Sequence, residues 1–237
     1  GGDMIAIAKT HPGKVRSSNQ DSYLLREEAT CRYAVADGMG GHRGGNVASA
    51  MAVEALQRLD LSAQPSPVHL REAVEAANDA IWERQLTDLS LSGMGTTLTV
   101  LWAGQDSLLV AHVGDSRLYS FAEGTLHQVT TDHSLVGELL RSGVITPEKA
   151  RRHPYRNIVT RAVGTDVSVT VDLLELNKIP GMRFLLCSDG LTEYAPPQVL
   201  ASSLAKDLNT AAQELLDIAL SGGGRDNITL IVLEVPV

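Results

Sequence analysis

Three stretches of the sequence join a short apolar run to an aspartate in a turn-like segment. Asp37 and Asp189 each follow such a run and precede a glycine, and Asp226 lies between three glycines and the apolar run that begins at Ile228. Short apolar runs bounded by turn residues are typical of buried strands, so each carboxylate is expected at a strand end, rigidly held and open on one side. Three converging carboxylates would form a hard-oxygen site for Mg²⁺ or Mn²⁺. Taken singly, each motif is more typical of an ordinary turn.

The composition excludes several classes of protein. The chain has 237 residues, ample for a sizeable core, and its net charge of −8 argues against a nucleic-acid surface because no basic stretch offsets it. No apolar run approaches the ~20 residues of a membrane span, and no secretory leader is visible. Cys31 and Cys187 lie in apolar runs, which favours buried thiols in a reducing compartment over a disulfide. We expect a cytoplasmic monomer without a nucleic-acid partner or a membrane span.

Hydrophobic periodicity divides the chain into segregated runs of strands and helices. Helical spacing predicts helices over residues 46–59 and from Pro67 onward, the second capped by Ser66, and a last helix capped by Asn209. Short helices are expected at residues 134–141 and 147–152, and strands at residues 4–8, 31–36, 95–102, 107–113, 116–121, 125–130, 167–176, 182–187 and 228–235. Segregation of this kind indicates an α+β fold with mainly antiparallel sheets, here in a single domain over residues 1–237.

Two further motifs place charged residues in turn-like segments. Arg16 opens a polar stretch, and a guanidinium fork can bind a dianionic phosphate through paired hydrogen bonds. A solvated surface arginine is the plainer interpretation. Gly114-Asp115-Ser116-Arg117 lies between two expected strands, where a hairpin turn explains it equally well. The sequence has no zinc motif and matches neither common nucleotide-binding fingerprint.

Six motifs in one order carry a resemblance that none of them carries alone. They are residues 16–21, Asp37-Gly38 with the glycines after it, Gly95-Thr96-Thr97, residues 114–117, Ser188-Asp189-Gly190 and residues 224–227. Over nearly its whole length the chain resembles the metal-dependent serine/threonine protein phosphatases of the PPM (PP2C) family, in their compact bacterial form. The resemblance implies a four-layer α-β-β-α sandwich, with two antiparallel sheets, helices on both outer faces and a metal cleft at one end.

The resemblance also implies a metal ligand set. Asp37 would bridge two Mn²⁺ or Mg²⁺ ions, Asp189 and Asp226 would complete one of them, and the backbone carbonyl of Gly38 would bind the other. Phosphate-monoester hydrolysis needs a nucleophile and neutralisation of the phosphoryl oxygens, and two cations about 4 Å apart can supply both through an activated water. This fits the absence of an evident nucleophilic side chain in the sequence.

Other matching positions imply supporting roles. Asp21 would hold a metal-bound water, Asp115 would bind a weaker third ion, and Arg16 would bind the phosphate. One position departs from the family pattern, because the eukaryotic members have a histidine, a proposed general acid, where this chain has Met39. His42 is nearby at a different spacing and is a candidate for protonating the leaving group. The alternatives are a loop histidine without a catalytic role and a metal-bound water as the acid.

Residues 133–165 match the family's flap, a mobile cover near the cleft that would affect substrate choice; a plain surface excursion is the alternative. The function implied is hydrolysis of phosphoserine and phosphothreonine on proteins, opposing a bacterial serine/threonine kinase. Two alternatives stay open, a non-catalytic phosphoprotein-binding regulator and a phosphoesterase acting on small molecules. The presence of Asp37, Asp189 and Asp226 favours an enzyme, since a degenerate relative would be expected to lose metal ligands.

Overall fold

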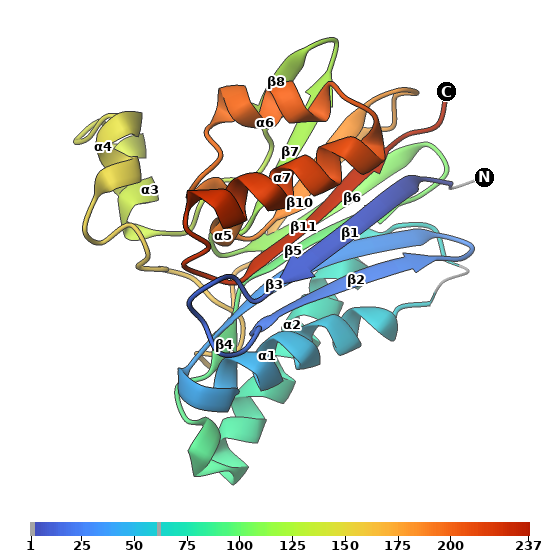
Figure 1. The fold of residues 1–237 in the computed structure, drawn as a ribbon. Coiled ribbons are helices and arrows are strands. Elements are labelled where there is room, and N and C mark those ends of the chain that lie inside the picture. Colours follow the sequence, from blue (N-terminus) through green and yellow to red (C-terminus); the bar gives the residue numbers. More distant parts are fainter. Residues whose placement is uncertain (1–2, 61–62) are drawn as a thin grey trace.

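Two antiparallel β-sheets stacked face to face form the centre of the computed structural model, which describes residues 3–60 and 63–237 apart from the side chain of His42 (Figure 1). The strands are β1 (Ile5–His11), β2 (Asp21–Glu27), β3 (Cys31–Met39), β4 (Gly95–Thr96), β5 (Leu98–Ala103), β6 (Ser107–Val113), β7 (Arg117–Ala122), β8 (Thr125–Gln128), β9 (Asp172–Asn177), β10 (Arg183–Cys187) and β11 (Ile228–Glu234). The first sheet has the order β1-β11-β10-β7-β8, and the second has the order β2-β3-β5-β6-β9 with β4 paired to β3.

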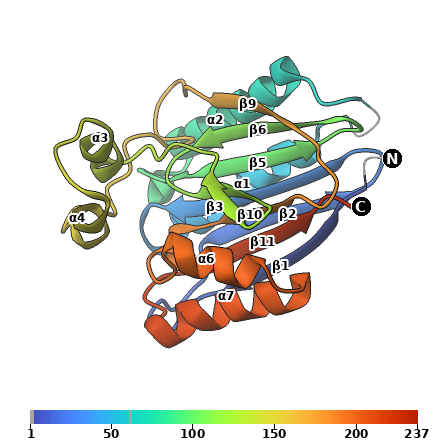
Figure 2. The same ribbon diagram turned by 90° about the horizontal axis from the view of Figure 1, so that it is seen from above.

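Helices cover the outer face of each sheet, as Figures 1 and 2 show. They are α1 (Gly41–Gln57), α2 (Pro67–Thr87), the short 3-10 helix η1 (Leu89–Leu91), α3 (Leu135–Arg141), α4 (Pro147–Arg152), α5 (Asp189–Thr192), α6 (Pro197–Leu204) and α7 (Leu208–Gly222). Helices α1 and α2 pack on the second sheet, and α5, α6 and α7 pack on the first. The predicted α-β-β-α sandwich is therefore confirmed. No helix in the described ranges is long and apolar enough to cross a membrane.

Three apolar layers hold these four structural layers together. In β11, Leu230 and Val232 pack with the helices of the first sheet, whereas Ile231 and Leu233 pack between the two sheets. Successive side chains of a strand point to opposite faces, so a strand covered on both faces must be apolar throughout. This explains why the central strands read as continuous apolar runs. Cys187 contributes to one of these layers and is fully buried, as expected of a thiol in such a run.

Three predicted boundaries are wrong for identifiable reasons. Helix α1 begins at Gly41, five residues before the expected start, because its first turns contain glycines that the apolar pattern cannot register. Asp207, not Asn209, caps α7: its carboxylate accepts a hydrogen bond from the amide of Thr210 at 3.1 Å. Strand β9 begins at Asp172, five residues later than expected, although Val169 and Val171 before it still pack on the core.

Four elements were not predicted: strand β2, helix α6 and the two shortest helices, η1 and α5. Strand β2 is an edge strand in which only Asp21 and Leu24 are buried, so its sequence has no clear alternation. Helix α6 starts with a proline at its first position, a common helix start, but it is only 8 residues long. The hairpin of β7 and β8, the two short helices α3 and α4, and the Ser66 cap of α2 agree with the sequence predictions.

The flap leaves the sandwich and returns to it at one place. Its helices α3 and α4 project from the end of the sandwich that is opposite the two termini (Figure 1). At its base, Ser134 and Val159 form an isolated β-bridge, and the amide of Thr160 donates to the carbonyl of His133 at 2.9 Å. The two ends of the segment are thus hydrogen-bonded to each other.

Candidate metal centre and active site

The predicted site residues surround one cavity of about 580 Å³ at the flap end of the sandwich. Its lining includes Arg16, Asp37, Gly38, Asp115, Asp189 and Asp226. Asp21 lies behind this lining: it is the strand partner of Asp37, and its Oδ2 accepts a hydrogen bond from the Thr229 hydroxyl at 2.7 Å. Six candidates from five separate places in the sequence therefore meet at one site, with a seventh beside them.

Sheet topology explains why two of the carboxylates converge. Strands β10 and β11 are antiparallel neighbours, so the end of β10 and the start of β11 lie at the same edge. Asp189 follows the first and Asp226 precedes the second. Their segments pass very close: a Cβ at Gly190 would lie 1.9 Å from the carbonyl oxygen of Asn227, so only glycine fits there.

Asp37 comes from the second sheet and is fixed through its backbone. Its amide donates to the hydroxyl of Thr97 at 2.9 Å, and its carbonyl accepts from the amide of Thr97 at 3.0 Å. The next residue, Gly38, packs against the first turns of α1: a Cβ there would lie 1.9 Å from the carbonyl oxygen of Gly45. Strand β3 therefore continues through Asp37 and Gly38, beyond its predicted end at Ala36, and this part of it is held by Thr97 on one side and α1 on the other.

Arg16 lies at the cavity rim beside Asp226. Its Nε is 3.5 Å from Asp226 Oδ1, and its side chain is 61% exposed. The loop that carries Arg16 is anchored by Asn227, whose amide side chain donates to two carbonyls and accepts from one amide within residues 12–20, at 2.8 to 2.9 Å. One side chain next to Asp226 therefore positions the predicted phosphate-binding arginine.

The segment that carries Asp115 is not a hairpin turn, which is one interpretation of its sequence. Strand β6 belongs to the second sheet and β7 to the first, so residues 114–116 cross from one sheet to the other. The crossing occurs at the edge where the other carboxylates lie. Asp115 is buried, with 8% of its surface exposed, and it lines the same cavity as Asp37 and Asp189.

Burial disfavours the ionised form of these carboxylates, so their pKa values are raised. Burial, and then the neighbouring carboxylates, raise the pKa of Asp37 and of Asp115 well above the usual aspartate value. Burial likewise raises the pKa of Asp189, and it raises the pKa of Asp21 to about 7. A dication would compensate the unfavourable burial of several negative charges.

The unsatisfied oxygens of the site fit a hard cation. Asp21 Oδ1 and Asp189 Oδ1 are buried and have no hydrogen-bond partner. Within the described ranges, no three His, Cys, Asp or Glu side chains are already spaced as a ligand cluster. Complete coordination would therefore also draw on water and backbone carbonyls, which is the usual habit of Mg²⁺ in proteins.

His42 is the last predicted site residue to place, and some residues that line the cavity were not predicted. Helix α1 contains His42 at its second position, but the side chain of that histidine lies outside the described part of the structure. Met39 lines the cavity. Sequence reasoning missed Asn157 and Val159, which bring the returning end of the flap into the cavity lining. They have no local signal, since only tertiary structure places them there.

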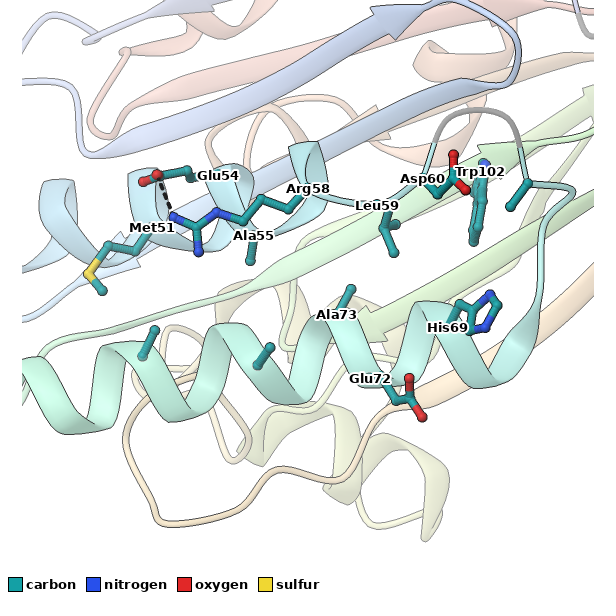
Figure 3. A pocket seen from close by; sticks show the side chains of 13 residues that line it. Met51, Glu54, Ala55, Arg58, Leu59, Asp60, His69, Glu72, Ala73 and Trp102 are labelled. Carbon is teal, nitrogen blue, oxygen red and sulfur yellow. Dashed lines mark hydrogen bonds and ion pairs between the residues drawn. The ribbon is translucent and has the colours of Figure 1, made fainter.

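Two other hollows differ in character. A cavity of about 240 Å³ under the flap shares Asp115, Asn157 and Asp189 with the main site. A hollow of about 460 Å³ lies between α1 and α2 beside Trp102, and Arg58 and Glu54 form an ion pair of 2.9 Å on its wall (Figure 3). The second hollow contains none of the predicted site residues.

Comparison with known proteins decides the family. The sequence model described as Protein phosphatase 2C matches residues 12–221. The chain belongs to the protein phosphatase 2C family. This PP2C chain is 39% identical to the serine/threonine phosphatase stp of Listeria monocytogenes, over 98% of this chain and 96% of that protein. It is 38% identical to the protein phosphatase PstP of Mycobacterium tuberculosis, over 96% of this chain and 44% of that protein.

Solved structures confirm the PP2C fold. The crystal structure of M. tuberculosis PstP superposes with a TM-score of 0.92 at 36% identity, covering 99% of both chains. The catalytic domain of PstP in complex with two manganese ions superposes with a TM-score of 0.90, also at 36% identity and 99% coverage of both. The resemblance stated from the six motifs is thus confirmed, and the chain is a phosphatase of this family.

Proposed function

We propose that this phosphatase hydrolyses phosphoserine and phosphothreonine on proteins at a dinuclear Mn²⁺ or Mg²⁺ centre. The observation that carries the proposal is the set of four carboxylates that line one cavity, with Asp189 Oδ1 buried and unpartnered. The names of relatives that match almost the whole chain support the substrate class.

The residues suit distinct positions in such a centre. Asp37 would lie between the two cations, Asp189 and Asp226 would bind one of them, and the Gly38 carbonyl would bind the other. Asp21, behind Asp37, would orient water next to the cations. When bound, the cations would neutralise phosphoryl oxygens and lower the pKa of the attacking water.

The chain's own side chains would position the substrate. Arg16 stands at the rim with its guanidinium largely exposed, so it can donate paired hydrogen bonds to a phosphoryl group while it stays beside Asp226. His42 is the candidate that would hand a proton to the leaving serine or threonine oxygen. Asp115 would hold a third, weaker cation at the crossing between the sheets.

The biological setting is part of the same proposal. Phosphoprotein substrates require a kinase that makes them, so a bacterial serine/threonine kinase is the expected opposing enzyme. We also propose that the chain acts as a monomer in the cytoplasm, a reducing compartment that suits its buried thiols.

A substrate comparison tests the proposal. The purified chain is incubated with a phosphothreonine peptide, a nucleotide and a sugar phosphate, with Mn²⁺ or with a chelator, and phosphate release is measured. We expect metal-dependent release from the peptide in clear preference to the small molecules. Equal or better hydrolysis of the small molecules would favour the phosphoesterase alternative, and peptide binding without release would favour the regulator.

A further inference from the structure

A histidine outside the metal-ligand set holds the turn that carries Asp115. The amide of Gly114 donates to Nδ1 of His133 at 2.9 Å, and the carbonyl of Gly114 accepts from the amide of His133 at 2.8 Å. Both backbone groups of the residue before Asp115 therefore bond to one partner. His133 is buried, with 5% of its surface exposed.

The turn has little freedom on its other side. Gly114 has a φ of 113°, a left-handed conformation that glycine adopts without strain. A Cβ at this position would lie 2.7 Å from the methyl group of Thr97. The hydroxyl of Thr97 also bonds to that of Ser116 at 2.7 Å. The Asp115 turn is thus wedged between Thr97 and His133.

The hydrogen bonds fix the tautomer of the imidazole. A backbone amide can only donate, so Nδ1 of His133 is the acceptor and has no hydrogen. Nε2 therefore carries the hydrogen of the neutral ring and donates to Asp172 Oδ2 at 2.7 Å. Arg161 donates to the other oxygen of that carboxylate at 2.8 Å. Burial lowers the pKa of His133, which agrees with a neutral ring.

The same histidine stands at the base of the flap. Its carbonyl accepts from the amide of Thr160, and the neighbouring Ser134 is bridged to Val159. His133 consequently contacts the Asp115 turn through its ring and the returning end of the flap, at Thr160, through its backbone carbonyl.

We propose that His133 is a positioning residue that fixes the Asp115 turn and joins it mechanically to the flap, with Asp172 selecting the tautomer that makes this possible. The effect on turnover rests on the proposed role of Asp115 in catalysis. The positioning of the turn itself is independent of that role, because it concerns a hydrogen bond of the free protein.

Two substitutions separate the two ring nitrogens. In His133→Asn, the side-chain oxygen can replace Nδ1 as acceptor for Gly114. In His133→Gln, the longer amide can replace Nε2 as donor to Asp172 but leaves Gly114 unpaired. His127→Gln, on the exposed surface of β8, is the matched control. Asp172→Ala is a second probe, because it keeps the ring and removes the group that selects the tautomer, together with the ion pair between Asp172 and Arg161.

The measurements are hydrogen exchange of the Gly114 amide in the metal-free protein, the ¹⁵N shifts of the His133 ring, and kcat and KM on a phosphothreonine peptide. We expect His133→Gln to speed Gly114 exchange by about three- to tenfold, the factor that one net hydrogen bond contributes, and to lower kcat with little change in KM. His133→Asn should stay near the parent in both. Asp172→Ala should speed exchange and add the second ring tautomer to the ¹⁵N spectrum.

Unchanged Gly114 exchange in both His133→Gln and Asp172→Ala would overturn the inference, as would equal losses of kcat in His133→Asn and His133→Gln. If the parent releases no phosphate from the peptide, the proposed function fails, and the Gly114 exchange still decides the positioning role. If His133→Gln does not fold, Asp172→Ala gives the same decision.

Discussion

Thr97 bonds to both backbone groups of Asp37, with its hydroxyl accepting the Asp37 amide at 2.9 Å and its own amide donating to the Asp37 carbonyl at 3.0 Å. The hydroxyl also meets that of Ser116, next to Asp115. One threonine therefore ties the proposed bridging carboxylate of the second sheet to the crossing that carries the proposed third-ion ligand. The relative position of these two carboxylates is set by Thr97 before any cation arrives.

Thr97→Val is expected to destabilise the protein and to weaken metal binding. Valine keeps the shape but removes the acceptor of the Asp37 amide, and a buried unpaired donor costs about 1–3 kcal/mol. Urea unfolding and calorimetric Mn²⁺ titration would measure both effects. Thr97→Ser, which keeps the hydroxyl, is the control and should lose much less. A valine variant with parental stability and Mn²⁺ affinity would contradict this role.

Asp189→Asn should nearly abolish activity, because a charged ligand is lost while the shape is kept. The metal-free variant should nevertheless melt at a higher temperature than the metal-free parent, since a buried amide replaces a carboxylate whose ionised form is disfavoured by burial. Phosphate release at saturating Mn²⁺ and thermal melting with a chelator would check the two halves. Activity close to the parent would remove Asp189 from the ligand set.

Arg16→Ala should raise KM and leave metal affinity near normal. The arginine is mostly exposed, and its contact with Asp226 is a loose ion pair of 3.5 Å, so little metal-site structure depends on it. Loss of a charge-assisted hydrogen bond to the phosphoryl group should weaken substrate binding by about 1.5–3 kcal/mol. Steady-state kinetics and Mn²⁺ titration separate the two effects, with Arg16→Lys as an intermediate case. A lost metal site with unchanged KM would reverse the assignment.

Asp115→Ala should keep two tightly bound cations, fold normally and lose much of its turnover. Fewer protein carboxylates would face the third cation, and hard-cation affinity follows ligand charge and site rigidity. Anomalous scattering from crystals of the variant at high Mn²⁺ would count the ions. Three remaining ions, or the loss of the two core ions instead, would show that Asp115 has a different role.

The pH dependence of stability should contain a contribution from His112. Its Nε2 donates to the Thr131 carbonyl at 2.9 Å, and burial lowers the pKa of this histidine from 6.5 to about 4. Between these values the unfolded chain binds a proton that the folded chain does not. The contribution of neutral His112 to the free energy of unfolding is therefore fully present above pH 6.5 and is lost as the pH falls toward 4. The loss is up to about 3 kcal/mol, since a tenfold change in proton affinity is worth about 1.4 kcal/mol.

Comparison with His112→Gln isolates that contribution from the other titrating groups. Glutamine can still donate to the Thr131 carbonyl but does not titrate. The stability difference between parent and variant, measured by urea unfolding at several pH values, should shrink between pH 6.5 and pH 4. A difference that stays constant over this range would mean that the pKa of His112 is the same in the folded and unfolded protein.

The sequence predicts the parts of this molecule whose causes are local. Apolar runs marked the central strands. The glycines at positions 38 and 190 were interpreted only as turn residues, and the structure shows that they also allow two backbones to approach closely. Asp37, Asp189 and Asp226 could be named as candidates because each adjoins an apolar run and a glycine-containing turn-like segment. Their convergence needed the order of six motifs, since spacing alone left each one interpretable as a turn.

What could not be predicted depends on contacts between distant segments. The Asp115 segment looked like a hairpin because two strands flank it, and only the packing of two sheets shows that it crosses between them. Strand β2 is stabilised by its pairing with β3, not by its own pattern. Asn157 reaches the cavity from a segment that has no pattern of its own, and the role of His133 appears only when Gly114 and Asp172 are seen on either side of its ring.

The hydrogen bonds at the base of the flap, which join residues 133–134 to residues 159–160, have a consequence for how this enzyme can change. His133 is hydrogen-bonded to Thr160, and Ser134 is bridged to Val159. The segment between Ser134 and Val159 is therefore a loop whose two ends are held together by backbone contacts that do not depend on the sequence of the loop. Closing such a loop depends only weakly on its length. The segment can thus be shortened, extended or replaced by that of a relative, while the sandwich and the carboxylates around the cavity keep their geometry.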